Sequence, residues 1–303
     1  MRGSLGCVLW GLLTVIFITG CSAGAPEDYR PAFTSQPPGG VKQLIFGVHP
    51  LHNPNKLFEV YGPIVDYLNE NLKDVSLRLE ASRNYDEFDK KLYARHFDLA
   101  LPNPYQTIKA MKHGYHVYGK MGDDENFRGI ILVRKDGVIR EVADLKGKTV
   151  SFPAATALAA TMMPQYYLHT HGLDINRDIT VAYVGSQESS IMNVYIGKAA
   201  AGATWPVPWI KFIKERPDIA EKLMVKWQTE TLPNNSLVAR DDTPAEVVER
   251  VGALLFTLQD SDRGRRMLEQ IPISRFEKAT DATYEPVRQY IRKFSKNVRP
   301  VEE

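Results

Sequence analysis

The stretch DLALPNPY, residues 98–105, places a short strand directly before the start of a helix. Asp98–Leu101 has the apolar character of a buried strand. Asn103 followed by Pro104 is typical of a helix start, because Asn caps free backbone N–H groups and Pro fits the first turn. This strand-to-helix step predicts one unit of an α/β protein.

The same step recurs on both sides of residues 98–105. Apolar runs predict strands at residues 44–48, 75–79, 98–101, 115–118, 129–134, 149–152, 179–184, 199–205 and 223–227. Helical spacing predicts helices at residues 57–72, 85–94, 103–114, 156–171, 188–196 and 209–215, and over most of 243–296. The alternation favours an α/β fold of mixed, mostly parallel sheets with flanking helices.

Composition excludes several protein classes. The chain has 303 residues, of which 44% are hydrophobic, so it is long enough for two lobes or one large α/β unit. Its formal net charge of +2 is too small for a typical nucleic-acid binder, and no nucleic-acid partner is expected. Two cysteines cannot build a disulfide framework or a four-thiolate metal site.

The first 20 residues are predicted to be a lipoprotein signal peptide. A basic start is followed by an apolar run that is short for a bilayer span. Ile18–Cys21 resembles the bacterial lipobox, which predicts cleavage before Cys21 and lipidation of its thiol. An uncleaved membrane anchor with an incidental cysteine is the alternative interpretation.

Residues 21–41 are rich in Pro, Gly and Ala and read as a flexible stalk. The predicted location is therefore the periplasmic face of a membrane, to which lipid on Cys21 attaches the protein. Ser22, in place of Asp after the cysteine, resembles lipoproteins that are passed to an outer membrane, where one exists.

The common enzyme motifs are missing from the sequence. Lys146–Thr149 looks like the end of a phosphate-binding loop, but it precedes a strand and lacks the first glycine. The three histidine pairs have no third ligand nearby in the sequence and are interpreted as surface residues. We therefore expect no catalytic residues, no metal site and no cofactor.

A set of short stretches, in order and at matching spacing, resembles the PhnD family, the substrate-binding proteins of phosphate, phosphite and phosphonate ABC transporters. These stretches are residues 47–50, 61–68, 84–85, 98–105, 127–135, 144–152, 185–187 and 233–234. The resemblance implies a two-lobed periplasmic binding protein fold of type II. It also implies a small-molecule ligand in the cleft between the lobes and a transporter permease as partner.

The resemblance places the lobe boundaries at two crossings of the chain. Residues 42–134 and 234–303 are expected to form lobe one, and residues 135–233 lobe two. A ligand that contacts both lobes would shift the protein toward a closed form, which a permease could distinguish from the open form.

The expected ligand loops depart from the family pattern. Residues 157–160 are Ala, Leu, Ala and Ala where the family has anion-binding hydroxyl groups, and Gln187 replaces a histidine. Ala200 stands where the family has an aspartate. Because hydrogen bonds to a charged group contribute about 1.5–3 kcal/mol each, these changes predict a less charged ligand, which a lipid or sterol would satisfy.

Nine residues are expected to contact the ligand: Tyr105, Thr156, Ala157, Gln187, Trp205, Tyr61, His49, Ser186 and Thr161. Apolar side chains that would suit such a ligand are Leu158, Met162, Met163, Trp205 and Trp209. The two methionines fit a helix core at least as well, and Trp205 fits a packed loop.

Two other functions remain open from the sequence. One is an enzyme on the same bilobal scaffold, for which His49 is the reactive residue at a matching loop. The other is a ligand sensor domain for a membrane kinase.

Overall fold

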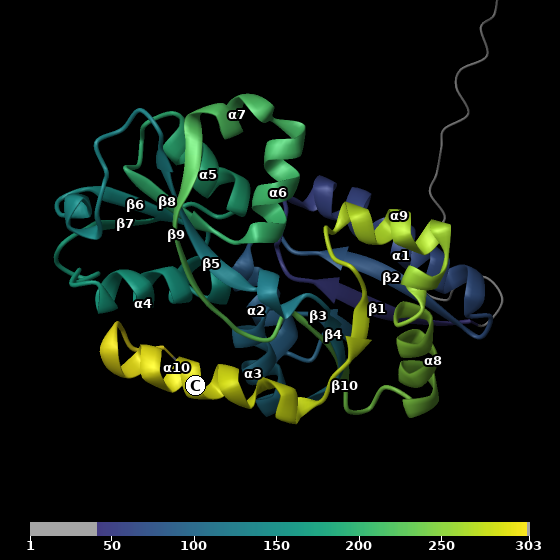
Figure 1. Ribbon diagram of the computed structural model, residues 1–303. Coiled ribbons are helices and arrows are strands. Elements are labelled where there is room, and N and C mark those ends of the chain that lie inside the picture. The colour runs from purple at the N-terminus through teal and green to yellow at the C-terminus, as the bar shows by residue number, and fades with distance from the viewer. Residues whose placement is uncertain (1–40, 302–303) are drawn as a thin grey trace, which may run out of the picture. The chain divides into compact units, whose positions relative to one another are not determined.

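The computed structural model describes residues 41–301 and contains two β-sheets with helices packed around them (Figure 1). The predicted signal peptide, the stalk and Cys21 lie outside these residues. Within residues 41–301, no helix combines the length and the apolar character that crossing a bilayer requires.

The first sheet has six strands in the order β11-β4-β10-β3-β1-β2. These strands are β1 (Lys42–Val48), β2 (Val75–Ala81), β3 (Leu99–Leu101), β4 (Tyr115–Met121), β10 (Ser236–Arg240) and β11 (Phe276–Lys278). β1 pairs in parallel with β2 and β3, with Leu44 opposite Leu77 and Val48 opposite Leu101. β10 lies antiparallel between β3 and β4.

The second sheet has five strands in the order β7-β6-β8-β5-β9. These strands are β5 (Arg128–Arg134), β6 (Thr149–Phe152), β7 (Thr180–Tyr183), β8 (Ala201–Thr204) and β9 (Leu223–Thr231). β6 pairs in parallel with β7 and β8, whereas β5 pairs antiparallel with β8 and β9.

The helices follow the predicted strand–helix order. They are α1 (Pro54–Asn71), α2 (Tyr85–Tyr93), α3 (Pro104–Lys112), α4 (Met163–Thr170), α5 (Gln187–Tyr195), α6 (Pro206–Glu215), α7 (Pro217–Lys222), α8 (Ala245–Leu255), α9 (Asp262–Gln270) and α10 (Glu285–Asn297). Asn103 caps α3 in a capping box with Gln106, which explains the helix start that DLALPNPY predicts. On α1 the apolar side chains spaced by three and four residues are buried, and they cover the first sheet.

Three features add detail that the sequence patterns did not predict. The helix expected at residues 156–171 begins with a π-helical turn, Leu158–Met162, before α4. The first sheet also contains β10, for which no element was predicted, and β11, which lies in the tail that read as mostly helix. Both sheets are mixed, because β1–β2, β1–β3, β6–β7 and β6–β8 are parallel pairs whereas the pairs that involve β4, β5 and β10 are antiparallel.

The chain passes between the sheets twice. It leaves the first sheet after β4 and enters the second at β5, so the outward crossing lies at residues 122–127, before the position near Arg134 that we expected. It returns between β9 and β10, at residues 232–235, which includes Pro233. We refer below to lobe one and lobe two as the parts built on the first and second sheets.

The last described residues come from lobe one and contact lobe two. Figure 1 shows α10 running below α3 and toward α4. Arg299 donates from Nη2 to the carbonyl oxygen of Ala155 (2.6 Å) and from Nε to Oε1 of Gln165 (3.1 Å). Asn176 donates to the carbonyl oxygen of Val298 (2.9 Å). The end of the chain therefore supports the segment that precedes the π-helical turn.

Candidate functional site

A small cavity lies where the strands of both sheets end. It is lined by His49, Tyr85, Asn103, Phe127, Ala157, Leu158, Ala159, Ala160, Gln187, Trp205 and Asn235. His49 and Asn103 follow the carboxyl ends of β1 and β3, and Trp205 follows that of β8. Ligands of α/β proteins bind at this edge, because loops and helix N-termini from several strands meet there. The cavity is thus positioned by the topology of both sheets.

The cavity is nearly closed. The space open to the centre of a water molecule is about 10 Å³, which is room for about one water. Trp205 is buried and packs against Phe127, with ring centroids 5.5 Å apart. A ligand larger than a water molecule therefore enters only when the lobes separate.

Several contacts join the lobes around this cavity. Asn103 Nδ2 donates to the carbonyl oxygen of Thr156 (3.1 Å), and His52 Nδ1 lies 3.0 Å from Oε1 of Glu188. Near the same edge, Lys56 Nζ pairs with Glu215 at 2.9 Å. These contacts link α1 and α3 of lobe one to lobe two, so the structure represents a closed arrangement of the lobes.

His49 presents a hydrogen-bond acceptor to the cavity. Burial lowers the imidazole pKa to about 4, although the bond to Leu101 favours the charged form and so opposes this shift. Because a carbonyl oxygen only accepts, the bond to Leu101 (2.8 Å) requires Nδ1 of His49 to carry the proton. The neutral ring then leaves Nε2 unprotonated, as an acceptor.

Asn235 adds a second acceptor. Its side chain is fully buried, and Oδ1 has no hydrogen-bond partner within the described chain. Its Nδ2 group donates weakly to the sulfur of Met121 (3.3 Å). A buried polar atom without a partner costs about 1–3 kcal/mol, and a ligand that donates to Oδ1 would remove this cost.

Backbone N–H groups supply donors on the opposite side. In the π-helical turn, the N–H groups of Thr161 and Met162 donate to the carbonyl oxygen of Ala157 (2.9 and 3.2 Å). Helix geometry leaves the N–H groups before them without intrahelical partners. The side chains here are Ala157–Ala160, so no hydroxyl group adds to these donors.

Gln187 is held in place by residues of both lobes. Its Oε1 accepts from Thr204 Oγ1 (2.8 Å), and its Nε2 donates to the hydroxyl of Tyr85 (3.4 Å). Tyr85 is fully buried, which raises the pKa of its hydroxyl above the usual range and keeps the proton in place. The Tyr85 hydroxyl therefore remains able to donate a hydrogen bond.

A buried carboxyl group lies close to these contacts. Asp89 is buried behind the cavity, where it accepts from Gln106 Nε2 (2.5 Å) and Thr156 Oγ1 (3.4 Å). Burial raises its carboxyl pKa to about 6, against the opposing effect of these two hydrogen bonds. None of the described residues that line the cavity carries a positive charge at neutral pH. The site therefore lacks the cation that would neutralise an oxyanion.

Four of the nine expected ligand residues line the cavity: His49, Ala157, Gln187 and Trp205. Thr156 lies beside it, and Ser186 caps α5 by accepting from the N–H of Ser189. The other three, Tyr105, Tyr61 and Thr161, are buried outside its lining, where Tyr61 belongs to the core face of α1.

Of the apolar residues expected to suit a less charged ligand, some line the cavity and others do not. Leu158 and Trp205 line the cavity, whereas Met162 is fully buried in the core. Trp209 packs in a separate apolar cluster with Ile130 and Leu132. Met163 is also buried, and it lines a different groove that is described below.

Sequence reasoning missed Asn103, Asn235, Tyr85 and Phe127 as lining residues. Asn103 was recognised as a helix cap, and its free amide donor is what reaches lobe two. Tyr85 and Phe127 stand in stretches that carry the family resemblance, which was the available signal. Within the described residues, no group of three His, Cys, Asp or Glu side chains could hold a metal ion.

Comparisons with known proteins point to one family. Residues 46–284 match the model of the family described as "ABC transporter, phosphonate, periplasmic substrate-binding protein". A probable ABC transporter phosphite-binding protein of Prochlorococcus marinus, PhnD1, is 22% identical over 186 residues. That alignment covers 57% of this chain and 63% of the relative, so the match spans less than two thirds of the relative's length.

Solved structures share the fold. The binding-protein component of an ABC phosphonate transporter from Pseudomonas aeruginosa aligns with a TM-score of 0.78 and 15% identity, covering 85% of this chain and 88% of that one. PhnD1 from Prochlorococcus marinus, in complex with methylphosphonate, aligns with a TM-score of 0.76 and 21% identity. The alignment covers 84% of this chain and 99% of that one. At these identities the likeness establishes a two-lobed, type II periplasmic binding protein fold.

Proposed function

We propose that this chain, which belongs to the family of periplasmic substrate-binding proteins of phosphonate ABC transporters, captures a compact solute between its lobes and delivers it to a membrane permease. The observation that carries the proposal is the cavity at the strand ends, because residues of both lobes line it. A ligand that contacts both lobes stabilises the closed form relative to the open one. The permease would then recognise the closed form.

We further propose that the ligand carries less charge than a phosphonate dianion. Asn235 Oδ1 lacks a donor within the described chain and His49 Nε2 can accept a hydrogen bond, whereas the Tyr85 hydroxyl and the backbone of the π-helical turn offer donors. An uncharged ligand that both donates and accepts matches this set. A dianion would bring no donor and would meet the carboxyl group of Asp89 behind the cavity. The polar side chains and backbone groups of the lining give no support to a lipid or sterol.

Membrane attachment through lipid on Cys21 is also part of the proposal. It is supported by the lipobox at Ile18–Cys21 and by the family, whose members act outside the cytoplasm. An intact-mass measurement of the membrane fraction tests it, since lipidated protein would be heavier than the chain that begins at Cys21, and Cys21→Ala would abolish the difference.

Calorimetry of the purified protein tests the ligand class. The panel consists of phosphate, phosphite, methylphosphonate and methanesulfonate as compact anions, and acetamide and urea as compact neutral ligands. We expect a neutral ligand to bind more tightly than methanesulfonate, which has no donor. Asn235→Ala should weaken that binding about fivefold, because one hydrogen bond of about 1 kcal/mol is lost.

Tyr61→Phe is the matched control, since it removes a buried hydroxyl outside the cavity and should leave affinity unchanged. Tight binding of phosphate or methylphosphonate, with no neutral ligand bound, would contradict the reduced-charge proposal while leaving solute capture intact. A panel without any binder would count against solute capture itself.

A further inference from the structure

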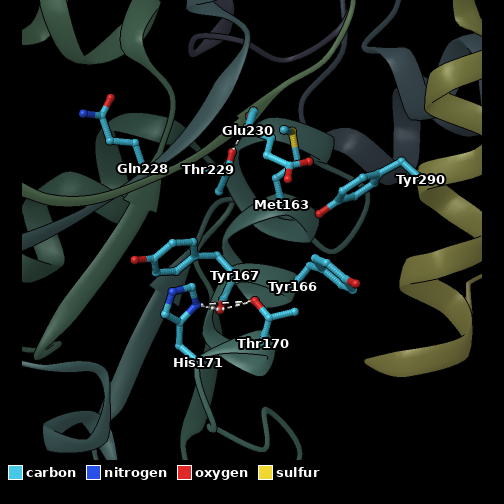
Figure 2. A pocket seen from close by; sticks show the side chains of 9 residues that line it. All are labelled: Met163, Tyr166, Tyr167, Thr170, His171, Gln228, Thr229, Glu230 and Tyr290. Carbon is cyan, nitrogen blue, oxygen red and sulfur yellow. Dashed lines mark hydrogen bonds between the residues drawn. The ribbon is translucent and has the colours of Figure 1, made fainter.

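A groove away from the cavity is rich in tyrosine, and we refer to it as the tyrosine groove. It is lined by Met163, Tyr166, Tyr167, Thr170, His171, Gln228, Thr229, Glu230 and Tyr290. These residues come from α4 and the residue after it, from β9, and from α10 (Figure 2). The space open to the centre of a water molecule is about 230 Å³, much larger than that of the cavity between the lobes. The groove is therefore large enough for a small organic ligand.

We propose that the tyrosine groove binds a small methylated ammonium cation of the choline type, independently of the ligand in the cleft. Two properties of the groove point to this class of ligand: aromatic side chains on both of its sides, and a carboxylate beside one of them (Figure 2). Across the described part of the chain, the lining of the cavity between the lobes contains no carboxylate.

The aromatic rings form two walls. Figure 2 shows Tyr167 on one side and Tyr166 and Tyr290 on the other. Tyr166 and Tyr290 meet edge to face, with centroids 5.6 Å apart and an interplanar angle of 70°. Tyr167 is fixed by His171, which stacks on one of its faces at 4.0 Å. Because tyrosine faces carry negative electrostatic potential, walls of this kind attract cations.

A carboxylate complements the rings. Glu230 is exposed, lines the groove and makes no ion pair within the described residues. Figure 2 shows its carboxylate near the hydroxyl of Tyr290. Burial, followed by the neighbouring Tyr166 and Glu230, raises the pKa of that hydroxyl well above its usual value, so Tyr290 remains neutral. The negative charge of the groove thus resides on Glu230.

One cation of the chain already contacts this aromatic group. Lys293 Nζ lies 5.0 Å from the centroid of the Tyr166 ring, but Lys293 is not among the lining residues. A cation of the chain itself therefore already lies over the Tyr166 ring. His171, which also lines the groove, bonds through Nδ1 to the carbonyl oxygen of Tyr167 (2.7 Å).

A methylated ammonium fits better than a primary amine or an anion. It has no N–H donor that must be satisfied when water is displaced, and ring faces together with one carboxylate can replace its weak hydration. An anion would meet the charge of Glu230 without a cation on the lining. The methyl groups would also contact Met163, whose side chain forms part of the lining.

Titration of the full-length protein, followed by NMR of methyl-labelled methionine, tests the proposal. The probes are choline and its uncharged isostere 3,3-dimethyl-1-butanol. We expect choline to produce a saturable shift of the Met163 signal and the neutral isostere to bind about tenfold more weakly. Equal affinities, or no saturable shift with choline, would overturn the proposal.

Variants separate the contributions of the carboxylate and the rings. Glu230→Gln and Tyr167→Leu should each weaken choline binding about fivefold. Glu246→Gln, an exposed position on α8, is the control and should leave it unchanged. If Glu230→Gln and Tyr167→Leu both bind choline like the wild type, the ligand lies elsewhere and the proposal fails.

A trimethylammonium group also occurs in lipid headgroups, so glycerophosphocholine forms a separate arm of the titration. Choline binding at least as tightly supports a free cation. Binding of glycerophosphocholine without binding of choline would overturn the proposal of a free cation and would indicate a lipid headgroup as the ligand. The calorimetric panel for the cleft contains no ammonium ligand, so failure at either site is recognised separately.

Discussion

At the scale of single residues, Asp89 has the clearest pH dependence. Burial raises its carboxyl pKa to about 6 in the folded protein, and the unfolded value lies near 4. As the pH falls through 6, the folded state takes up a proton before the unfolded state does, so acidification increases stability. Above pH 6 the buried charge therefore costs stability.

We predict that Asp89→Asn raises the free energy of unfolding by about 2 kcal/mol at pH 8, after allowance for residual exposure. The difference should shrink to a few tenths of a kcal/mol near pH 4, where the folded wild type is already neutral. Urea unfolding at both pH values measures it, with exposed Asp66→Asn on α1 as the control. A gain of equal size at both pH values would contradict a charge-based cost.

The ionisation of His49 makes stability depend on pH in the opposite direction. Burial lowers its pKa to about 4, so the unfolded state takes up a proton below pH 6.5 while the folded state stays neutral. Stability is consequently lost as the pH falls from about 6.5 to 4. Comparing Asp89→Asn with the wild type at one pH removes this contribution, because both proteins contain His49.

Part of the site could be predicted residue by residue. His49, Ala157, Gln187 and Trp205 follow predicted strands, and sequence position alone suffices to bring such residues to one edge. Asn235 could not be found in this way. Its importance rests on an acceptor atom left without a partner, and that property depends on every neighbour in the folded protein.

At the scale of elements, β5 packs unusually closely against the π-helical turn. A Cβ atom added at Gly129 would lie 2.6 Å from the carbonyl oxygen of Ala159 and 2.6 Å from Cδ of Pro164. Ala159 lines the cavity, so the close approach at Gly129 helps to determine where the turn lies. Only a glycine allows this spacing without displacement of backbone.

We predict that Gly129→Ala destabilises the protein by about 1–3 kcal/mol, because the turn must move to accommodate the methyl group. Thermal unfolding measures the loss, and the fluorescence of Trp205 should report the displaced turn. Gly137→Ala is the control, since its added Cβ would meet nothing closer than 3.3 Å. Equal effects of the two substitutions would show that the contact at Gly129 does not constrain the turn.

Element prediction succeeded where local signals were strong. Apolar spacing identified α1 and a cap identified α3, whereas β10 was left unassigned and β11 was missed in a tail that reads as helix. Residues 236–240 become a strand because β3 and β4 pair with them on both sides. Such tertiary pairing, between segments far apart in the sequence, has no local signature.

At the scale of the whole molecule, the contact between His52 and Glu188 holds the lobes together. The two side chains are 3.0 Å apart, and His52 is buried while Glu188 is partly exposed. Although burial alone would raise it, the carboxyl pKa of Glu188 is lowered by the hydrogen bond and charge of His52. The contact therefore favours the closed arrangement of the lobes.

We predict that Glu188→Gln shifts the ligand-free protein toward the open form about fivefold, equivalent to about 1 kcal/mol for a partly exposed charged hydrogen bond. Small-angle X-ray scattering should record a larger radius of gyration. Asp74→Asn, which breaks an ion pair with Arg250 inside lobe one, is the control. Unchanged scattering from both Glu188→Gln and His52→Ala would show that this contact does not hold the lobes.

The contact of Arg299 with Ala155 has a practical consequence for handling the protein. The guanidinium group holds the backbone two residues before Ala157, which lines the cavity. Substitutions or fusions that displace Arg299 would therefore shift the backbone that leads into the π-helical turn, and they should be avoided when ligand affinities are measured. An affinity handle placed ahead of Lys42 leaves this contact intact.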